Sequence, residues 1–419
     1  MSEILHKYRF IESILPSSKT RRLVIITGAR QTGKTTLAQF KYPELAYINL
    51  DAPENRESIR SISSVSWGKN IGNAILDEAQ KEPTAFEKVK YAYDGRHISF
   101  CLLLGSSQIL LLKKIRESLA GRVFIYELWP LMMSEVFEKQ DSSPEPPFID
   151  RFFSKTDFEH LLNQMPNILL ESMDSFHREA EQYILQWGGM PALLSLSDEV
   201  RWKWLKDYEY TYLERDLSDL ARLDDLSPFR IFQRLSALRS GRLLNYSELA
   251  RDAGLSVDTA RRYLEYLRLS YQTILLHPYH KNITSTVIKT PKLYWIDVGL
   301  MRVVSGLRET ISGEIYETMV ISELFKWMKT MQRGEEIYFY RTRSGLELDL
   351  LLPTEAGIIG IEIKSRKTIV PSDLRTMREV AAGLKKEWRG GLIIYQGNEI
   401  KKLDHPRIWA IPSRRLFIR

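Results

Sequence analysis

Residues 22–35 read RLVIITGARQTGKT, an apolar run that ends in a glycine-rich loop. The loop has the spacing Gly28-x4-Gly33-Lys34-Thr35, which is the phosphate-binding loop pattern. Glycines let the backbone curl so that its N–H groups point inward at phosphate oxygens. The segment TTLAQF then begins a helix, whose dipole favours an anion at its N-terminus. The stretch therefore predicts an α/β fold that places a phosphate-binding turn between a strand and a helix.

Side chains of this loop have separate expected roles. Lys34 would pair with the β- and γ-phosphates of ATP, and Thr35 would hold Mg²⁺. The residues predicted to bind the nucleotide from the loop are Gly28, Ala29, Arg30, Gln31, Thr32, Gly33, Lys34, Thr35 and Thr36.

Further apolar runs predict neighbouring strands at AYINLD (46–51) and NAILDEAQK (73–81). The second run ends in Asp77-Glu78, at the end of a strand where open α/β sheets bind ligands. Asp77 would hold Mg²⁺, directly or through water, and Glu78 would orient and deprotonate the attacking water. Without the loop upstream, an acidic pair after a strand is usually a helix N-cap.

Two later residues each have two interpretations. The strand HISFCLLLGSSQ (97–108) leads to Ser106, which either senses the γ-phosphate or belongs to a simple turn. The segment SLAGRVFIYELWPLMMSEV (118–136) contains Arg122. Arg122 either acts as an arginine finger on a neighbour's nucleotide, which requires a homo-oligomer, or is a surface charge.

The combination GARQTGKT, LDEAQ, LLLGSSQ and LAGRV…ELWPLMMSE resembles a family of AAA-type P-loop ATPases of bacteria and archaea. The resemblance spans essentially the whole chain. It implies a C-terminal region of uncharacterised function that ends in a restriction-endonuclease-like domain.

The middle of the chain predicts helices and then a winged helix-turn-helix. Residues 141–147, which are rich in proline and serine, are typical of a linker, and WGGMP (187–191) is typical of a turn. Residues 245–280 contain two helical segments joined at Leu255-Ser256, then a strand, QTILLHPY. The second helix would meet DNA or serve as a protein-binding scaffold through its exposed residues Thr259, Arg261, Arg262 and Glu265.

Residues 345–365, GLELDLLLPTEAGIIGIEIKS, place charged side chains inside two apolar runs. Charged groups are costly to bury without partners. Alternation along a strand directs Glu347 and Asp349 to one side, and likewise Glu362 and Lys364. Upstream, helical spacing places Glu317 on an apolar face.

This order of a helix Glu, a strand Asp and a strand Glu-x-Lys resembles the PD-(D/E)XK nuclease core. The resemblance implies that Asp349 and Glu362 bind Mg²⁺ or Mn²⁺, that Lys364 steers the attacking water, and that Glu317 assists. A shared cation would offset the repulsion between the carboxylates. The alternative is a nuclease-like fold that binds DNA or protein without cutting.

Composition adds a partner and a compartment to these predictions. The net charge is +7, and residues 360–419 hold 14 Lys or Arg against 6 Asp or Glu. This basic segment predicts DNA as a partner, with a solubilising surface as the alternative. The single cysteine, Cys101, excludes a disulfide framework or a zinc cluster. The chain shows neither a signal peptide nor an apolar stretch of membrane-spanning length, which predicts a cytoplasmic protein without a membrane partner.

The sequence therefore predicts four parts: an AAA-type P-loop ATPase domain (1–140), a linker and helical region (141–235), a winged helix-turn-helix (236–302) and a PD-(D/E)XK nuclease-like α/β domain (303–419). The predicted function is ATP binding and hydrolysis coupled to DNA binding, with Mg²⁺-dependent DNA cleavage at the C-terminal site. The alternative is a nucleotide-dependent switch whose C-terminal domains are a non-catalytic scaffold for protein interactions.

Overall fold

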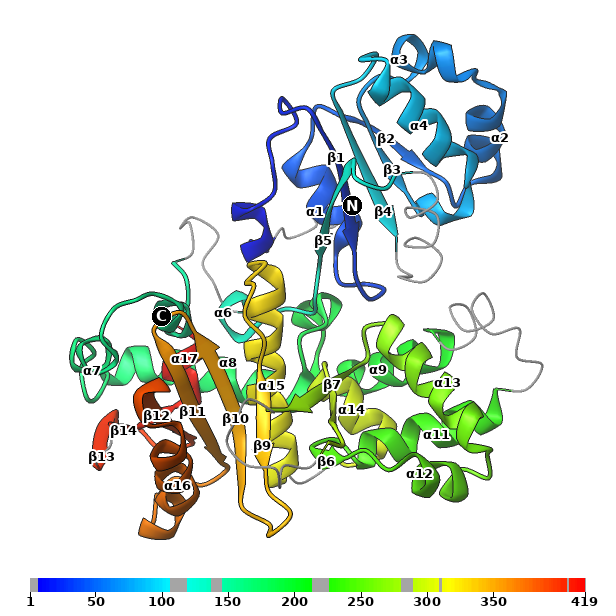
Figure 1. Cartoon of the computed structure of the whole chain (residues 1–419). Helices are drawn as coiled ribbons and strands as arrows, with labels where there is room; N and C mark the ends of the chain where they lie inside the picture. Colours follow the sequence, from blue (N-terminus) through cyan, green and yellow to red (C-terminus); the bar gives the residue numbers. More distant parts are fainter. Residues whose placement is uncertain are drawn as a thin grey trace.

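The computed structural model describes residues 7–105, 119–136, 145–212, 226–279, 289–308, 311–404 and 407–418. A five-stranded sheet with its helices lies at one end, and a larger body built on a nine-stranded sheet lies at the other (Figure 1). Helix α15 (Gly313–Thr330) stands at the centre of the larger body (Figure 1). Within the described residues, no helix combines the length and the apolar character needed to cross a membrane.

The N-terminal sheet is parallel throughout and has the order β2-β3-β4-β1-β5. Alternate residues of β1 pack on opposite faces: Leu23 and Ile25 face the cluster of α2, α3 and α4, whereas Val24 faces α1. Helices on both faces explain why the strands read as continuous apolar runs. The strands are β1 (Arg22–Thr27), β2 (Ala46–Asn49), β3 (Ala74–Asp77), β4 (Phe100–Gly105) and β5 (Val123–Glu127), and the helices are α1 (Lys34–Lys41), α2 (Pro53–Ser61), α3 (Trp67–Asn70) and α4 (Thr84–Asp94).

A helical region follows, and the predicted turn WGGMP lies at its centre. Gly189 is required there because a Cβ on it would lie 2.1 Å from the carbonyl oxygen of Leu131. Of the predicted linker at 141–147, residues 141–144 lie outside the described residues. The helices are α6 (Met133–Val136), α7 (Phe158–Asn163), α8 (Glu171–Trp187) and α9 (Asp198–Tyr212).

The two helices predicted within residues 245–280 are present. Helix α12 (Tyr246–Asp252) ends before Gly254, which has a φ of +67°, and the Ser256 hydroxyl caps α13 (Val257–Leu269) by accepting from the N–H of Thr259. The predicted strand is β7 (Thr273–Pro278), which pairs antiparallel with β8 (Lys292–Trp295). The remaining elements of this region are α11 (Ser227–Leu238), β6 (Arg242–Leu243) and α14 (Val298–Ser305).

The C-terminal strands flank the predicted hairpin. The hairpin itself is β10 (Glu347–Thr354) paired antiparallel with β11 (Gly357–Lys364). Two further strands were not predicted, β13 (Lys401–Asp404) and β14 (Ile408–Pro412). The other elements are β9 (Tyr338–Arg341), α16 (Arg375–Leu384), β12 (Trp388–Tyr395) and α17 (Ser413–Phe417). Short 3-10 helices lie at Phe10–Ser13, Ser64–Ser66, Ala79–Lys81, Phe148–Phe153, Pro191–Ser195, Pro371–Leu374 and Lys385–Glu387.

One sheet continues from the middle of the chain into its C-terminal region. Its order is β13-β14-β12-β11-β10-β9-β7-β8-β6, and the join is the parallel pairing of His277 with Tyr338 and of Pro278 with Phe339. Figure 1 shows β7 running across the direction of β9 and β10. The sheet therefore crosses the expected domain boundary at residues 302–303, and side chains from both regions can reach one site.

Helix α15 binds the segment that follows β5, the last strand of the N-terminal sheet. Its buried pair Glu323 and Lys326 holds that segment: the N–H of Met133 donates to Glu323 at 2.7 Å, and Lys326 Nζ donates to the Leu131 carbonyl at 3.1 Å. The N-terminal segment also packs on α15, with the rings of Phe10 and Trp327 5.0 Å apart. Buried polar and aromatic contacts thus hold both the N-terminal segment and the segment after β5 to one helix.

Candidate functional site

The glycine-rich loop between β1 and α1 has the backbone that its glycines allow. Gly28 has a φ of +155°, and a Cβ there would lie 2.1 Å from the carbonyl oxygen of Leu128. Gly33, just before α1, has a left-handed φ of +93°. A side chain at the first position would clash with backbone, and at the second it would be strained. The loop and the start of α1 thus form the turn that the sequence predicts.

Lys34 and Thr35 lie at the start of α1 and face two different partners. Lys34 Nζ donates to the carbonyls of Gly28 and Ala29 at 2.9 and 2.6 Å, within the loop itself. The Thr35 hydroxyl donates to Asp77 Oδ2 at 2.6 Å. Since Asp77 ends β3, the fold brings together the two predicted Mg²⁺ ligands across 42 residues of sequence. Hydroxyl and carboxylate oxygens are donors that Mg²⁺ prefers, so these residues fit the ion.

Glu78 follows Asp77 in a strained backbone conformation. Its φ and ψ are 50° and 43°, a left-handed conformation that is uncommon for residues other than glycine and is found at functional sites. Gln80 Nε2 donates to Glu78 Oε2 at 2.5 Å, and the Glu78 N–H donates to Asp77 Oδ1 at 2.9 Å. The carboxylate is therefore oriented by a neutral amide.

Sequence reasoning missed Tyr47, whose hydroxyl donates to Asp77 Oδ2 at 2.8 Å from the neighbouring strand β2. Burial and this hydrogen bond raise the pKa of Tyr47 above its ordinary value. The only signal in the sequence is that Tyr47 comes two residues before the end of the strand that pairs with β3. Ser106 lies outside the described residues.

Three side chains from distant segments support the loop from outside. Arg9 donates to the carbonyls of Thr32 and Trp129 at 2.9 and 2.6 Å. Tyr208 donates to the Arg30 carbonyl at 3.2 Å, and Tyr271 donates to the Thr27 hydroxyl at 3.1 Å. No local pattern marks these residues, because each contact joins elements far apart in the sequence.

Arg122 lies away from the loop of its own chain. It precedes β5, whose first residue, Val123, pairs with Leu23, whereas the loop follows the opposite end of β1 at Thr27. Its guanidinium pairs with Asp94 at 2.9 Å on the surface. Arg122 can therefore reach a nucleotide only if that nucleotide is bound to another subunit.

The C-terminal hairpin brings Asp349, Glu362 and Lys364 together. Asp349 Oδ2 accepts from the N–H of Ile363 at 2.7 Å, and Lys364 Nζ donates to Glu362 Oε1 at 2.5 Å. An irregularity in the β9–β10 register lies between Leu348 and Leu351, beside Asp349. Bulges of this kind re-aim side chains, and here the carboxylate is directed at the neighbouring strand.

Two carboxylates of this cluster, Asp349 and Glu362, have raised pKa values. Burial raises the pKa of Asp349 well above its ordinary value, and Glu362 and Glu317 raise it further. Burial also raises the pKa of Glu362, against the opposing effect of Lys364. Since the Glu317 carboxylate contributes to the raised pKa of both Asp349 and Glu362, it lies near both of them.

Sequence reasoning missed the partners of Glu317. Its Oε1 accepts from the Tyr294 hydroxyl at 2.5 Å and lies 3.3 Å from Lys292 Nζ. The same Nζ lies 2.5 Å from Glu347 Oε1, and Arg341 lies 2.8 Å from Glu347 Oε2. The available signal was a lysine in the otherwise apolar run KLYW of β8, two residues before Tyr294.

The fit of a divalent ion to this cluster is partial. Glu362 Oε2 is buried and has no hydrogen-bond partner among the described residues, as expected of an atom that awaits a ligand. Glu317 and Glu347 are held by cationic side chains. Across the described ranges, no group of three or more His, Cys, Asp or Glu residues is arranged to hold a metal ion. The residues that fit an ion are therefore Asp349 and Glu362, without Glu317.

The basic C-terminal segment is less available than its composition suggests. Arg389, Arg414 and Arg415 are buried, where Arg389 donates to main-chain carbonyls and Arg414 pairs with Asp174. Exposed cations of the segment that pair with carboxylates are Arg366, Arg375, Arg378, Lys401, Lys402 and Arg407. Much of the positive charge thus serves the fold or local ion pairs.

Helix α13 presents the residues that the winged-helix prediction singled out. Arg261, Arg262 and Glu265 are exposed, and Thr259 is partly exposed. The Arg261 guanidinium stacks 4.6 Å from the ring centre of Tyr246, and Glu265 pairs with Arg268. Two arginines therefore remain at the surface of the second helix.

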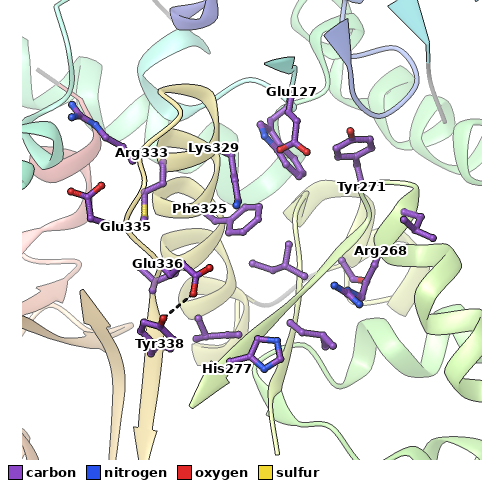
Figure 2. Close-up of a pocket in the computed structure, with 18 of the residues that line it drawn as sticks. Glu127, Arg268, Tyr271, His277, Phe325, Lys329, Arg333, Glu335, Glu336 and Tyr338 are labelled. Carbon is purple, nitrogen blue, oxygen red and sulfur yellow. Dashed lines mark hydrogen bonds between the residues drawn. The ribbon is translucent and has the colours of Figure 1, made fainter. Parts of the chain in front are cut away.

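A cavity of about 360 Å³ lies between the N-terminal sheet and the larger body. Figure 2 shows Tyr271, Phe325 and Lys329 around it, with Glu127 of β5 on one side and Arg268 of α13 on the other. Glu265, predicted on the DNA-facing helix, lines it, whereas none of the described residues predicted for catalysis or for nucleotide or metal binding does. Tyr271, which lines the cavity, also donates to the hydroxyl of Thr27, the residue before the glycine-rich loop.

Three family matches cover most of the chain. Residues 20–137 match the AAA domain family. Residues 178–310 match a domain of unknown function (DUF8612), and residues 312–416 match another (DUF4143).

Similar proteins and structures extend over much of the chain. The uncharacterised protein Rv2008c of Mycobacterium tuberculosis is 27% identical over 404 residues, covering 94% of this chain and 81% of that protein. The uncharacterised protein MJ1544 of Methanocaldococcus jannaschii is 23% identical over 353 residues, covering 79% of this chain and 72% of that protein. The Walker-type ATPase PABY2304 of Pyrococcus abyssi aligns with a TM-score of 0.42 at 17% identity, covering 67% of this chain and 90% of that one. The signal-transduction ATPase PH0952 of Pyrococcus horikoshii, with a tetratricopeptide repeat sensor, aligns with a TM-score of 0.26 at 13% identity. The alignment covers 77% of this chain and 47% of that one.

These scores are too low to carry a fold argument, whereas the family match and the loop geometry agree on one segment. The parallel sheet, the glycine-rich loop and the contact between Thr35 and Asp77 all lie within residues 20–137. The N-terminal part of the chain therefore has the parallel sheet and the phosphate-binding loop of a P-loop fold, in the segment that matches the AAA domain family.

Proposed function

We propose that the chain is a Mg²⁺-dependent ATPase whose turnover takes place at the N-terminal loop. The contact between the Thr35 hydroxyl and Asp77 Oδ2 carries the proposal, because it joins the two predicted ion ligands beside Glu78. Mg²⁺ would neutralise charge on the β- and γ-phosphates when ATP is bound.

Each side chain then has one task. Lys34 exchanges its two loop carbonyls for phosphate oxygens, and the loop N–H groups bind the remaining phosphate oxygens. Glu78 accepts a proton from the attacking water, with its carboxylate held by Gln80. Tyr47 and Thr35 keep Asp77 in place.

The test is ATP hydrolysis by the Glu78→Gln variant. We expect turnover to fall roughly 10²- to 10⁴-fold with little change in ATP affinity, because only the base is removed. Phosphate release measures the first quantity and a fluorescent ATP analogue the second. Glu87→Gln, an exposed change on α4, is the matched control. Equal turnover in Glu78→Gln and wild type would remove Glu78 from this role.

DNA is the partner that we propose for the rest of the chain, with α13 and the C-terminal region as the contact. The exposed Arg261 and Arg262 support it, since the second helix of a winged helix-turn-helix enters the major groove. The competing proposal is a protein-binding scaffold, and the many ion pairs of the C-terminal segment favour neither.

Charge reversal separates the two partners more cleanly than truncation. Deleting residues 303–419 would remove β9 from β7 and take away α15, so lost binding could reflect lost folding. We expect Arg261→Glu/Arg262→Glu to weaken DNA binding and to reduce its salt dependence, as measured by fluorescence anisotropy. Lys19→Glu/Lys69→Glu, at exposed positions of the ATPase domain, is the control. If the region is instead a protein-binding scaffold, adding DNA should leave the rate of ATP hydrolysis unchanged in every variant.

A second activity, metal-dependent DNA cleavage at Asp349 and Glu362, is supported by one observation. The buried Glu362 Oε2 has no hydrogen-bond partner among the described residues, next to the half-buried Asp349. Lys364 would stabilise charge on the cleaved phosphate. Incubation of duplex, single-stranded and branched DNA with Mn²⁺ tests the proposal, with Asp349→Asn as the inactive control. Intact DNA in every case would leave a binding role alone.

A further inference from the structure

The charged residues of the C-terminal cluster are nearly balanced within the chain. Four carboxylates belong to it, namely Glu317, Glu347, Asp349 and Glu362. The cations among them are Lys292, Arg341 and Lys364. The cluster would therefore carry one net negative charge with every group ionised.

Lys292 is the central cation of the set. Its side chain is 4% exposed, and its Nζ lies 3.3 Å from Glu317 and 2.5 Å from Glu347. The ammonium also lies 5.7 Å from the ring centre of Phe339. Burial alone would lower the pKa of Lys292, but Glu317, Asp349 and Glu347 raise it above its ordinary value. The group is thus a buried ammonium that bridges two carboxylates.

The position of Lys292 in the chain gives the bridge its significance. Lys292 belongs to β8, in the region predicted as a winged helix-turn-helix, whereas Glu317 and Glu347 belong to α15 and β10. Tyr294 reaches the same Glu317 oxygen from the same strand. The middle region therefore completes the cluster through two side chains.

From this geometry we propose that Lys292 is the resident cation of the C-terminal cluster. Its ammonium binds the carboxylates of Glu317 and Glu347, so that a divalent ion can bind only at Asp349 and Glu362. The inference rests on the proposed metal site, and it assigns Lys292 as a positioning residue that limits that site to two carboxylates. A hard divalent ion and an ammonium compete for the same carboxylate oxygens, so removing one favours the other.

Direct Mn²⁺ titration tests the proposal without relying on DNA cleavage. All proteins carry Asp77→Asn, which removes the N-terminal candidate ligand, and are free of nucleotide. Free Mn²⁺ is counted by electron paramagnetic resonance. We expect Lys292→Met to bind Mn²⁺ at least about tenfold more tightly than the parent, or to bind an additional equivalent, because two carboxylates lose a neighbouring cation. Lys289→Met, at an exposed position before β8, should bind as the parent does.

Two further variants guard against loss of folding. Lys292→Arg keeps the charge and should bind Mn²⁺ as the parent does. Lys292→Met/Glu317→Gln/Glu347→Gln removes the cation and both of its carboxylates together, so it should fold and gain no Mn²⁺ affinity. Circular dichroism checks the fold of each protein.

The possible results separate this proposal from the metal site on which it rests. If the parent binds Mn²⁺ and Lys292→Met binds it equally, Lys292 is not the resident cation, although the Asp349–Glu362 site stands. If the parent does not bind but Lys292→Met does, the resident-cation proposal is supported and the metal site of the wild type is rejected. Absence of binding in both rejects both.

Discussion

At the nucleotide loop, the carboxylate of Asp77 is held by the hydroxyls of Thr35 and Tyr47. At the C-terminal cluster, Glu317 and Glu347 are held by Lys292 and Arg341. Neutral hydrogen-bond partners orient a carboxylate without changing its negative charge, whereas cationic partners compensate that charge. The first arrangement leaves the carboxylate its negative charge, as the proposed Mg²⁺ site requires. In the second arrangement, cationic side chains compensate most of the negative charge. This explains how charged residues lie in apolar strands without a high free-energy cost.

The largest effect is expected on α15, the helix that contacts both regions. Lys326→Met should lower the free energy of unfolding by about 3–5 kcal/mol, because it leaves the buried Glu323 carboxylate without its cationic partner. Burial already raises the pKa of Glu323 above its ordinary value. Urea denaturation measures the loss. Lys329→Met, at an exposed position one turn away, is the control, and equal losses in the two variants would contradict the assignment.

Asp77→Asn should affect turnover next most strongly, with a fall of roughly 100-fold or more in Mg²⁺-dependent ATP hydrolysis. Asparagine keeps the shape of the side chain but removes the negative charge that the hydroxyls leave intact. The comparison variant is Glu347→Gln, in the charge-balanced cluster, which should hydrolyse ATP at the wild-type rate. A similar fall in both variants would mean that the two sites do not act separately.

A smaller effect is expected at the contact between Tyr271 and Thr27. Tyr271→Phe removes one hydrogen bond behind the nucleotide loop and should cost about 1 kcal/mol of stability. If the larger body responds to nucleotide binding through this contact, a bound nucleotide should slow amide hydrogen exchange in β7 less in the variant than in the wild type. Hydrogen exchange measures this difference, and unchanged protection would exclude Tyr271 as a link.

The smallest effect is a pH dependence at Asp297. This buried carboxylate accepts from the N–H groups of Gly189 and Leu300 at 2.7 and 2.8 Å, and burial raises its pKa above the ordinary value. A raised pKa in the folded state stabilises the fold at low pH, and this contribution is lost as the pH rises from about 3.9 through the raised pKa. Asp297→Asn lacks the titration, so its stability relative to wild type should increase with pH across that window. Thermal melts at several pH values, with Asp198→Asn as the exposed control, would show it; a constant difference would contradict it.

Motifs of short span were predicted well from the sequence. The glycine loop, the strand before it and Asp77-Glu78 lie within local patterns whose geometry follows from backbone sterics and strand alternation. The same reasoning located the hairpin at 345–365 and the N-cap at Ser256. It did not find β13 or β14. It predicted a basic surface from the charge excess of residues 360–419, although Arg389, Arg414 and Arg415 of that segment are buried.

The sequence by itself determined which residues of the loop and the hairpin carry charge, because composition and spacing are local properties. Only the tertiary structure decided which partners meet them. Lys292 reaches Glu347 across 55 positions of sequence because β7 and β9 join two regions into one sheet. Arg9 and Tyr271 reach the nucleotide loop in the same way. Such contacts depend on how whole elements pack, and packing has no period or spacing that a single sequence displays.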